Sequence, residues 1–332
     1  MAEDCQHQHD NCPADELLAC PLHAEFAGKS ADATPCNREC PSARLRQAAA
    51  EAKLAALDRQ AADGAKPWKL HRRWDRAARL FGETPFERLS NASVTVFGLG
   101  GVGSYTVEGL VRSGVGRVVM VDFDDVCVTN VNRQLHAMKG AYSKPKCDML
   151  AERMQRINPD AEIVPVKVFY NADTSDALLG DKPDFVVDAI DNMTAKAHLI
   201  ATCVERGIPL VSSMGAAGKL DPTAIEIADL SETHGCAMAR AMRKILRQKY
   251  GLGTDKTQTG VHAVFSAEER TVPHDLSYDE AAGGFLCVCP SRANDFHTCD
   301  DRNLIDGSAG FVTSVFGMTC ASVVVRTIIG RM

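Results

Sequence analysis

The feature that most constrains the fold is a glycine-rich segment, Gly98-Leu-Gly-Gly-Val-Gly103, which directly follows a short apolar run at 94–97. An apolar, β-branched run of this length predicts a buried strand, and the residues after the glycines have the pattern of a helix. Glycines at Gly98, Gly100 and Gly103 permit a tight turn and a close approach of the backbone to a phosphate. The N–H groups at the helix start then face the anion. The segment, which includes Gly101, therefore predicts a nucleotide phosphate loop.

Further short apolar runs alternate with helical segments along the chain. We expect strands at 117–121, 163–168, 185–187, 208–211 and 224–228, and helices at 104–112, 146–157 and 194–206. This alternation predicts an α/β fold with a Rossmann-like, doubly wound, mostly parallel sheet and a C-terminal extension. Residues 251–283 are rich in Gly, Thr and Asp, and we expect a loop or small subdomain there.

The chain divides into an N-terminal appendage at 1–70 and a nucleotide-dependent domain at 71–330. Within that domain we expect the nucleotide site in 94–196 and the substrate part in 208–330. The appendage begins with eight cysteines and histidines whose spacing matches no common zinc pattern: Cys5, His7, His9, Cys12, Cys20, His23, Cys36 and Cys40. We expect a mostly disordered tail, with a metal site as the alternative and a helix over 42–62.

Composition limits the environment and the partners. A net charge of −6 argues against a protein that coats nucleic acid without specificity. The 13 irregularly spaced cysteines indicate free thiols in a reducing compartment, and the N-terminus has no basic, apolar secretory signal. These features predict a cytoplasmic protein. The uncharged run 307–325 is interpreted as a buried helix, with a membrane anchor as the alternative.

Acidic residues follow two of the expected strands. Asp122 lies 19 residues after Gly103, where a carboxylate can accept the ribose hydroxyls, and Asp124 follows it. Asp191 comes at the end of another strand, close after Asp188. Ligands bind at the carboxyl edge of an open parallel sheet, so this position suits Asp191 for holding Mg²⁺. The alternative for Asp188 is a local cap or hydrogen bond.

Cationic and amide side chains complete the expected site. Asn130 and Arg133 lie on the loop after Asp122, and arginine suits bidentate contact with phosphate. Lys146 follows Pro145 at a helix start, where its ammonium can reach phosphate oxygens. The set predicts an MgATP site, whereas the glycine pattern alone is also typical of NAD-dependent oxidoreductases.

From about Arg73 to Arg326 the chain resembles the ubiquitin-activating-enzyme-like adenylating proteins, which include the molybdopterin-synthase and thiamine sulfur-carrier adenylyltransferases. The resemblance is greatest to the branch that dehydrates threonylcarbamoyladenosine in tRNA, especially through Asp124-Asp-Val-Cys-Val-Thr-Asn130. The other motifs that carry it are Arg79-Leu-Phe-Gly82, the glycine segment, the rest of 122–134, Ile157-Asn-Pro159, Asp188-Ala-Ile-Asp191 and residues 212–222.

The resemblance implies specific roles for the site residues. It implies that Asp122 binds ribose, that Asn130, Arg133 and Lys146 bind phosphate, and that Asp191 binds Mg²⁺. It also implies a symmetric dimer in which an arginine near the domain start reaches the ATP of the partner subunit. Arg76 matches that arginine by its spacing to Gly82, and Arg79 is the alternative.

Two features distinguish among the branches of the family. The sulfur-carrier branches usually hold zinc with two Cys-x-x-Cys pairs, whereas the late cysteines here are Cys287, Cys289 and Cys299. The expected helix at 237–250 carries five positive charges and no acid: Arg240, Arg243, Lys244, Arg247 and Lys249. Because phosphate contacts typically dominate nucleic-acid affinity, this helix predicts a tRNA-binding surface, with a solvated helix face as the alternative.

The sequence therefore predicts ATP-dependent cyclisation of threonylcarbamoyladenosine in tRNA through an acyl-adenylate. The first alternative is an adenylyltransferase that activates the C-terminal glycine of a ubiquitin-like sulfur carrier, in which Cys236 would be a candidate nucleophile. The others are an NAD-dependent oxidoreductase and a non-catalytic tRNA-binding protein. A sulfur-relay protein partner and membrane association stay open.

Overall fold

The structure is a computed structural model that describes residues 69–180, 182–253, 258–274, 276, 293–294, 297–298 and 306–332. The expectations for the N-terminal cysteines and histidines, for the helix at 42–62, and for Cys287, Cys289 and Cys299 lie outside the described residues. The prediction of free thiols is confirmed for the cysteines that are described: Cys127, Cys147, Cys203, Cys236 and Cys320 are free and buried.

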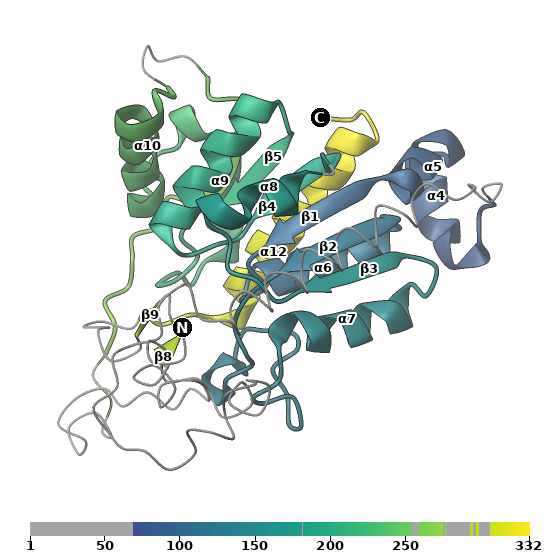
Figure 1. Cartoon of the computed structure of the whole chain (residues 1–332), viewed down its shortest axis with the longest axis horizontal. Helices are drawn as coiled ribbons and strands as arrows, with labels where there is room; N and C mark the ends of the chain where they lie inside the picture. Colours follow the sequence, from purple (N-terminus) through teal and green to yellow (C-terminus); the bar gives the residue numbers. More distant parts are fainter. Residues whose placement is uncertain are drawn as a thin grey trace, which may run out of the picture. The chain divides into compact units, whose positions relative to one another are not determined.

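Seven strands form one sheet in the order β3-β2-β1-β4-β5-β7-β6 (Figure 1). The strands are β1 Ser93–Phe97, β2 Arg117–Val121, β3 Glu162–Val166, β4 Phe185–Asp188, β5 Leu210–Ser213, β6 Ile225–Asp229 and β7 His262–Ser266. Neighbouring strands are parallel, except that β6 runs antiparallel to β7. The strand order changes direction between β1 and β4, and this switch point is where doubly wound sheets bind ligands. The predicted fold class is confirmed.

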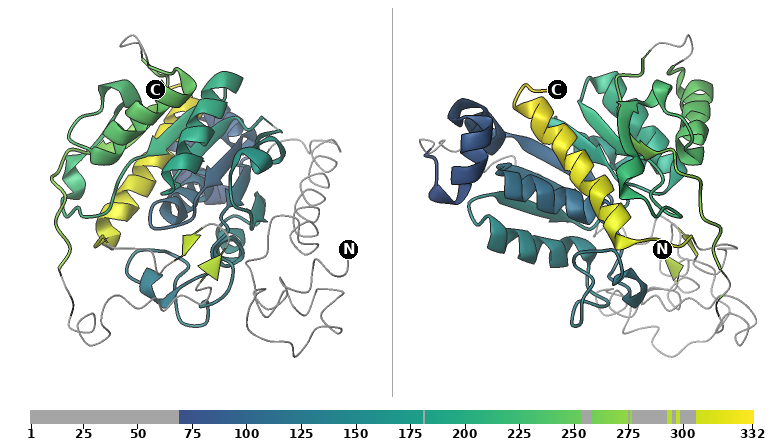
Figure 2. Two further views of the ribbon diagram at one scale, coloured as in Figure 1. Left: turned by 60° about the vertical axis from the view of Figure 1, so that its left-hand side comes forward. Right: turned by 180° about the vertical axis from the view of Figure 1, so that it is seen from behind.

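Helices cover both faces of the sheet. The α-helices are α4 Asp75–Phe81, α5 Glu83–Asn91, α6 Gly103–Ser113, α7 Lys146–Ile157, α8 Ala172–Leu179, α9 Met193–Arg206, α10 Ala237–Tyr250 and α12 Gly310–Ile328. The short helices are η2 Arg72–Trp74, η3 Val128–Asn130, η4 Pro222–Ala224 and η5 Leu230–Glu232, and a small ribbon pairs β8 Ala293–Asn294 with β9 His297–Thr298. Helices α8 and α9 lie on the face seen in Figure 1, whereas α6, α7 and α12 lie on the face seen from behind in Figure 2.

The prediction of a loop or small subdomain at 251–283 was wrong for 262–266, which form β7 of the main sheet. Ala263, Val264 and Phe265 are fully buried, and β7 pairs with β5 on one side and β6 on the other. The run is short and is preceded by Thr259 and Gly260, so its own pattern is weak. Pairing with two strands from distant parts of the chain makes it a strand, since β propensity depends strongly on tertiary context.

Helix α12 contains most of the uncharged run 307–325, which was interpreted as a buried helix with a membrane anchor as the alternative. It is long and apolar enough to cross a membrane by length and composition. Its buried side chains, including Val312, Phe316 and Val324, belong to the main hydrophobic core. Glycines allow close packing on α6, because a Cβ on Gly109 would lie 2.8 Å from the Ala321 Cβ. The core position accounts for the apolar composition.

Candidate active site

The glycine loop connects β1 to α6 at the switch point. Gly98 has a φ of +84°, and a Cβ there would lie 2.6 Å from the Ala189 carbonyl oxygen. A Cβ on Gly103 would overlap the Gly98 carbonyl oxygen. The two glycines are therefore required by local geometry, and they let the first turn of α6 begin directly beside the end of β4. This arrangement presents backbone N–H groups to an anion.

The beginning of α12 supports the glycine loop from behind. A Cβ on Gly101 would lie 3.1 Å from the Thr313 Cβ and 3.3 Å from the Arg133 Cγ. The Asn132 side chain donates a hydrogen bond of 2.8 Å to the Ser308 carbonyl oxygen. The C-terminal helix thus holds both the glycine loop and the loop that carries Arg133.

Buried Asp122 and Lys146 form a charged group with the half-buried Asp124 between the end of β2 and the start of α7. Asp122 accepts hydrogen bonds from the backbone N–H of Leu99 at 2.6 Å and of Asp124 at 2.8 Å. The Lys146 ammonium lies 2.7 Å from Asp124 Oδ2 and 4.0 Å from Asp122 Oδ1. Lys146 is 6% exposed and Asp122 is 7% exposed, so water screens these charges little.

The charges in this group shift the pKa values of its members. Burial raises the pKa of the Asp122 carboxyl, and the Lys146 charge opposes that shift. Burial alone would lower the pKa of Lys146, but Asp122, Asp124 and Asp191 together hold it above its ordinary value. Lys146 is therefore a permanent cation beside the glycine loop, as phosphate binding requires.

Asn130 and Arg133 lie on the segment that begins with η3. Asn130 is buried, and its Oδ1 accepts a hydrogen bond of 3.0 Å from the Cys127 N–H, which leaves its amide NH₂ to other partners. Arg133 Nη1 donates to the Thr129 carbonyl oxygen at 2.9 Å and to Asn132 Oδ1 at 3.0 Å. These contacts hold the guanidinium against its own segment, while the Arg133 Cγ lies beside Gly101. Asn130 itself is fixed by the turn around it.

The loop after β4 carries Asp188 and Asp191, which have different environments. Asp188 is fully buried and lies 2.8 Å from the ammonium of Lys196, which is also fully buried. Asp191 is exposed. Asp188 therefore fits the alternative given for it above, a local hydrogen bond, since its Oδ1 accepts from the Ile190 N–H. The sequence did not identify Lys196, because a lysine within a helical pattern normally indicates a solvated position.

Gln134 and His136 are two further polar side chains that the sequence did not identify. Both are buried, and Gln134 Oε1 and both ring nitrogens of His136 have no hydrogen-bond partner among the described residues. A Cβ on Gly100 would lie 3.9 Å from Gln134 Nε2, so this amide faces the glycine loop. Their position after Arg133 is the only sequence signal that could have indicated them.

The protonation of His136 predicts a specific loss of stability in acid. Burial, followed by the charge of Lys146, lowers its pKa from 6.5 to about 3. Between pH 6.5 and about pH 3, His136 is therefore protonated in the unfolded chain but stays neutral in the folded chain. We expect the free energy of unfolding to fall by about 1.4 kcal/mol per pH unit from this residue alone between pH 6 and 4.

Urea unfolding of the wild type and of His136→Leu at pH 6, 5 and 4 measures this contribution. The wild type should lose stability more steeply with falling pH, and the difference between the two slopes should equal the figure above. A His71→Leu variant, at an exposed position, should follow the wild type. Parallel curves for the wild type and His136→Leu would contradict the buried neutral state of His136.

Helix α10 carries the five predicted basic residues in two different environments. Arg240, Lys244, Arg247 and Lys249 are exposed. Arg243 is half-buried and donates to the Thr233 carbonyl oxygen at 2.9 Å and to the Thr233 hydroxyl, so it stabilises the turn at η5. The helix begins beside the carboxyl edge of the sheet, since a Cβ on Gly215 after β5 would lie 3.6 Å from the Met238 Cβ.

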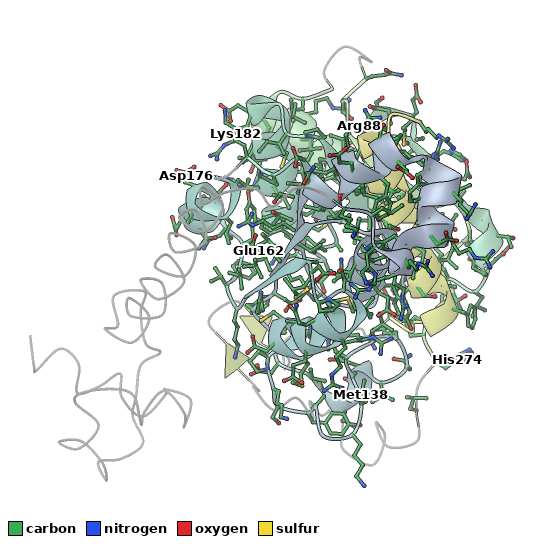
Figure 3. The ribbon with its side chains drawn as sticks, turned by 90° about the vertical axis from the view of Figure 1, so that its right-hand side faces the viewer. Arg88, Met138, Glu162, Asp176, Lys182 and His274 are labelled. Carbon is green, nitrogen blue, oxygen red and sulfur yellow. The ribbon has the colours of Figure 1, made fainter. Side chains whose placement is uncertain are left out.

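Arg76 does not belong to the nucleotide site within one chain. It is exposed on α4, which precedes α5 and the start of β1, whereas the glycine loop follows the end of β1. In Figure 3, Arg88 of α5, the helix that follows α4, is labelled in the upper part of the view and Met138 of the loop after η3 in the lower part. Arg79 is also exposed and pairs with Asp75 at 3.0 Å. The other predicted nucleotide-site residues converge at the carboxyl edge.

Comparison with known proteins yields one family. The model of the ThiF family matches residues 74–332. A tRNA threonylcarbamoyladenosine dehydratase of Bacillus subtilis is 46% identical over 191 residues, which are 58% of this chain and 73% of the relative. A dehydratase of the same name from Escherichia coli is 36% identical over 256 residues, which are 75% of this chain and 91% of the relative.

Solved structures give the same result. The crystal structure of the Escherichia coli tRNA N6-threonylcarbamoyladenosine dehydratase in complex with ATP aligns with a TM-score of 0.67 and 33% identity. The alignment covers 78% of this chain and 94% of that chain. The shared fold therefore extends over nearly the whole of that enzyme.

Proposed function

Because this chain belongs to the ThiF family, we propose that it is an ATP-dependent tRNA threonylcarbamoyladenosine dehydratase. The observation that carries the proposal is the charged group of Asp122, Asp124 and Lys146 beside the glycine loop. It would supply a carboxylate for ribose and a cation for phosphate at the switch point, and relatives that share the fold bear this name. A dinucleotide oxidoreductase would leave Lys146 and Asp191 without a common role.

We propose a reaction in two steps for this site. The carboxylate of the threonyl group attacks the α-phosphorus of ATP, the bond to the bridging oxygen breaks, and pyrophosphate leaves. Lys146 and Arg133 stabilise the charge that develops on the phosphate oxygens. A nitrogen or oxygen atom of the same threonylcarbamoyl group then attacks the activated carbonyl carbon, closes a ring and loses its proton. AMP leaves with the former carboxylate oxygen, so the net change in the nucleoside is the loss of one water.

Asp191 is the residue that we expect to hold Mg²⁺. Among the described residues no group of three or more acidic, histidine or cysteine side chains could hold a metal ion. Mg²⁺ usually binds through one or two carboxylates together with substrate phosphates, so a single exposed Asp191 beside the phosphate loop fits it. The ion would neutralise charge on the pyrophosphate. The protein residues would orient the reacting groups.

The sulfur-carrier alternative has less support. The full sequence contains no Cys-x-x-Cys pair, so the usual zinc site of that branch cannot form from such pairs. Cys236, its candidate nucleophile, is 5% exposed at the start of α10. Incubation with ATP, Mg²⁺ and tRNA bearing threonylcarbamoyladenosine tests the choice. We expect AMP release and a nucleoside lighter by one water in mass spectrometry. AMP formation with a carrier protein but not with tRNA would overturn it.

We also propose a symmetric dimer built on the exposed face of α12. Phe311, Val315 and Met318 follow one stripe of this helix and are 57%, 37% and 42% exposed. A groove of about 380 Å³ continues this stripe towards α4, and Phe81 and Ile329 both line it. Helix α12 has 19 residues, so it is about 28 Å long. In an antiparallel pair of α12 helices, α4 of one copy would lie near the glycine loop of the other.

Mixed dimers give a direct test of Arg76 in trans. In a mixed dimer, the site of the Arg76→Ala subunit contains its own Asp191 and receives Arg76 from the Asp191→Ala subunit, so this site is complete. The site of the Asp191→Ala subunit lacks both groups. Each variant alone should be nearly inactive. After random exchange of subunits, half of the dimers are mixed and one of their two sites is complete, so the mixture should recover about a quarter of wild-type activity. No recovery in mixed dimers shown to form would contradict the assignment, and recovery with Arg79→Ala instead would select Arg79.

The exposed side of α10 is the tRNA surface that we propose. Arg240, Lys244 and Arg247 recur at helical spacing along one stripe. We expect Arg240→Gln combined with Arg247→Gln to raise the KM for tRNA about tenfold or more. The slope of log affinity against log salt should decrease by roughly one for each lost phosphate contact. The KM for ATP should not change.

A matched control removes two exposed charges elsewhere. Arg156→Gln combined with Lys182→Gln changes the net charge equally, and both residues are exposed outside α10. It should keep the wild-type salt slope. Equal salt slopes for the α10 variant and the wild type would show that α10 is only a solvated helix.

We expect a cytoplasmic enzyme, and a sulfur-relay partner remains a prediction without structural support.

A further inference from the structure

The ion pair between Lys196 and Asp188 is wholly buried. Lys196 of α9 and Asp188 at the end of β4 each have no exposed side-chain surface, and Nζ lies 2.8 Å from Oδ2. The Ser212 hydroxyl on β5 donates a hydrogen bond of 2.6 Å to the same carboxylate oxygen. The pair therefore joins two strands and one helix beneath the carboxyl edge of the sheet.

Stability alone does not account for this pair. Removing two charges from water costs several kcal/mol per ion, and well-packed neutral residues of similar volume are often as stable or more stable. We therefore attribute the pair to a structural role: it holds nearby backbone in a position that neutral side chains would not maintain. The hydrogen bonds around the pair identify that backbone.

The pair fixes the residue immediately before Asp191 by both of its backbone groups. Lys196 Nζ donates to the Ile190 carbonyl oxygen at 3.1 Å, and the Ile190 N–H donates to Asp188 Oδ1 at 3.1 Å. On the other side of Asp191, the Asn192 side chain caps α9 by accepting from Thr194 and Ala195 N–H groups at 3.1 Å and 3.0 Å. Asp191 is thus an exposed residue between two anchored neighbours.

The same segment contacts the glycine loop. The Ala189 N–H donates to the Phe97 carbonyl oxygen at 2.8 Å, and only the absence of a side chain at Gly98 lets the Ala189 carbonyl approach. A displacement of Ile190 would therefore change the distance between Asp191 and the phosphate loop.

We propose that Lys196, through its buried contacts with Asp188 and Ile190, is a positioning residue that sets Asp191 for the metal ion of MgATP. The inference rests on the proposed function, in which Asp191 holds Mg²⁺. Lys196 does not touch the nucleotide. It acts on the backbone that carries Asp191, in the way that residues behind a metal ligand orient that ligand.

The test uses the full chain and two readouts that need no turnover. The main variant is Asp188→Asn combined with Lys196→Met, which buries no uncompensated charge. Calorimetry measures the Kd of ATP with and without Mg²⁺. Hydrogen exchange of the nucleotide-free protein measures protection of the amides at 188–192. Asp191→Ala is the reference, Ser212→Ala is a milder second variant, and Thr202→Ala removes another buried hydroxyl, on α9, as the control.

We expect Mg²⁺ to tighten ATP binding in the wild type and in Thr202→Ala, and not in Asp191→Ala. The double variant should lose about tenfold or more of this gain, bind ATP without Mg²⁺ as the wild type does, and exchange faster at 188–192. Ser212→Ala should show the same changes to a smaller extent, and it tests the proposal even if the double variant does not fold.

Two results would overturn the inference in distinguishable ways. If Asp191→Ala loses the Mg²⁺ gain while the double variant and Ser212→Ala keep it with wild-type exchange, Lys196 does not position Asp191. If Asp191→Ala keeps the gain, the metal role of Asp191 in the proposed function is wrong, and Lys196 loses its route of action with it.

Discussion

Replacing Lys146 by methionine is expected to lower kcat/KM for MgATP by about 100- to 1,000-fold, the usual effect of removing one preorganised electrostatic contact to a transition state. Lys146 is buried within 2.7 Å of Asp124, and nearby carboxylates keep its pKa raised, so it carries its charge at every physiological pH. The loss should fall mainly on kcat, because the charge on the phosphates grows as pyrophosphate leaves. Steady-state assays of AMP release measure it.

Two controls separate catalysis from folding in this experiment. Lys146→Met leaves Asp122 and Asp124 without their cation, so a variant that also carries Asp124→Asn should recover thermal stability and remain inactive. Lys167→Met breaks a half-exposed ion pair with Asp125, 2.9 Å long, on the same loop system. Exposed pairs contribute little, so its activity should stay within about threefold of the wild type. A Lys146→Met/Asp124→Asn enzyme with near-normal kcat would disprove the phosphate role of Lys146.

Replacing Asp191 by alanine is expected to lower kcat by roughly 100- to 1,000-fold at physiological Mg²⁺. Asp191 is exposed, and its charge is only one of three that hold the pKa of the buried Lys146 raised, so we expect a small change in melting temperature. Binding of ATP without Mg²⁺ should also be unchanged, whereas the gain from Mg²⁺ should disappear. Turnover measured over a range of Mg²⁺ concentrations distinguishes a lost ligand from a general loss of nucleotide affinity.

The control for Asp191 is another exposed carboxylate. Asp160, which pairs with Arg73 at 2.9 Å and is itself 73% exposed, lies after α7 and away from the glycine loop. Asp160→Ala should leave kcat and the Mg²⁺ dependence unchanged. If Asp191→Ala turned over within threefold of the wild type, Mg²⁺ would have to be held by another group, and Asp124 would be the next candidate.

Most of the sheet was predictable because its strands carry local signals. The strand expected at 117–121 has the bounds that the structure gives, and the helix expected at 146–157 likewise. Both follow from apolar runs and from periodicity, which depend on neighbours in the sequence. The order of the strands was not predicted, because alternation with helices and the handedness of crossovers limit the possible orders without selecting one. β7 was missed because its signal is its pairing, which is not local.

The candidate site was only partly predictable for a related reason. Asp122, Lys146 and Asp191 follow expected strands or open an expected helix in the same domain as the glycine loop, so their types and their combined positions indicate them. Gln134, His136 and Lys196 were missed because their importance depends on burial. Arg243 was predicted to face tRNA but instead bonds to Thr233, since a helix pattern does not say which arginine turns inward.

The sequence by itself determined the glycine loop and the fold class, and it predicted the acids and cations of the nucleotide site, because turn geometry, periodicity and charge are properties of neighbouring residues. Only the tertiary structure decided that α12 supports the glycine loop through Thr313, that Arg76 lies away from the site of its own chain, and that Lys196 holds Asp188 out of water. These facts join residues distant in sequence. Packing and burial determine these contacts, and neither can be predicted from a local sequence pattern.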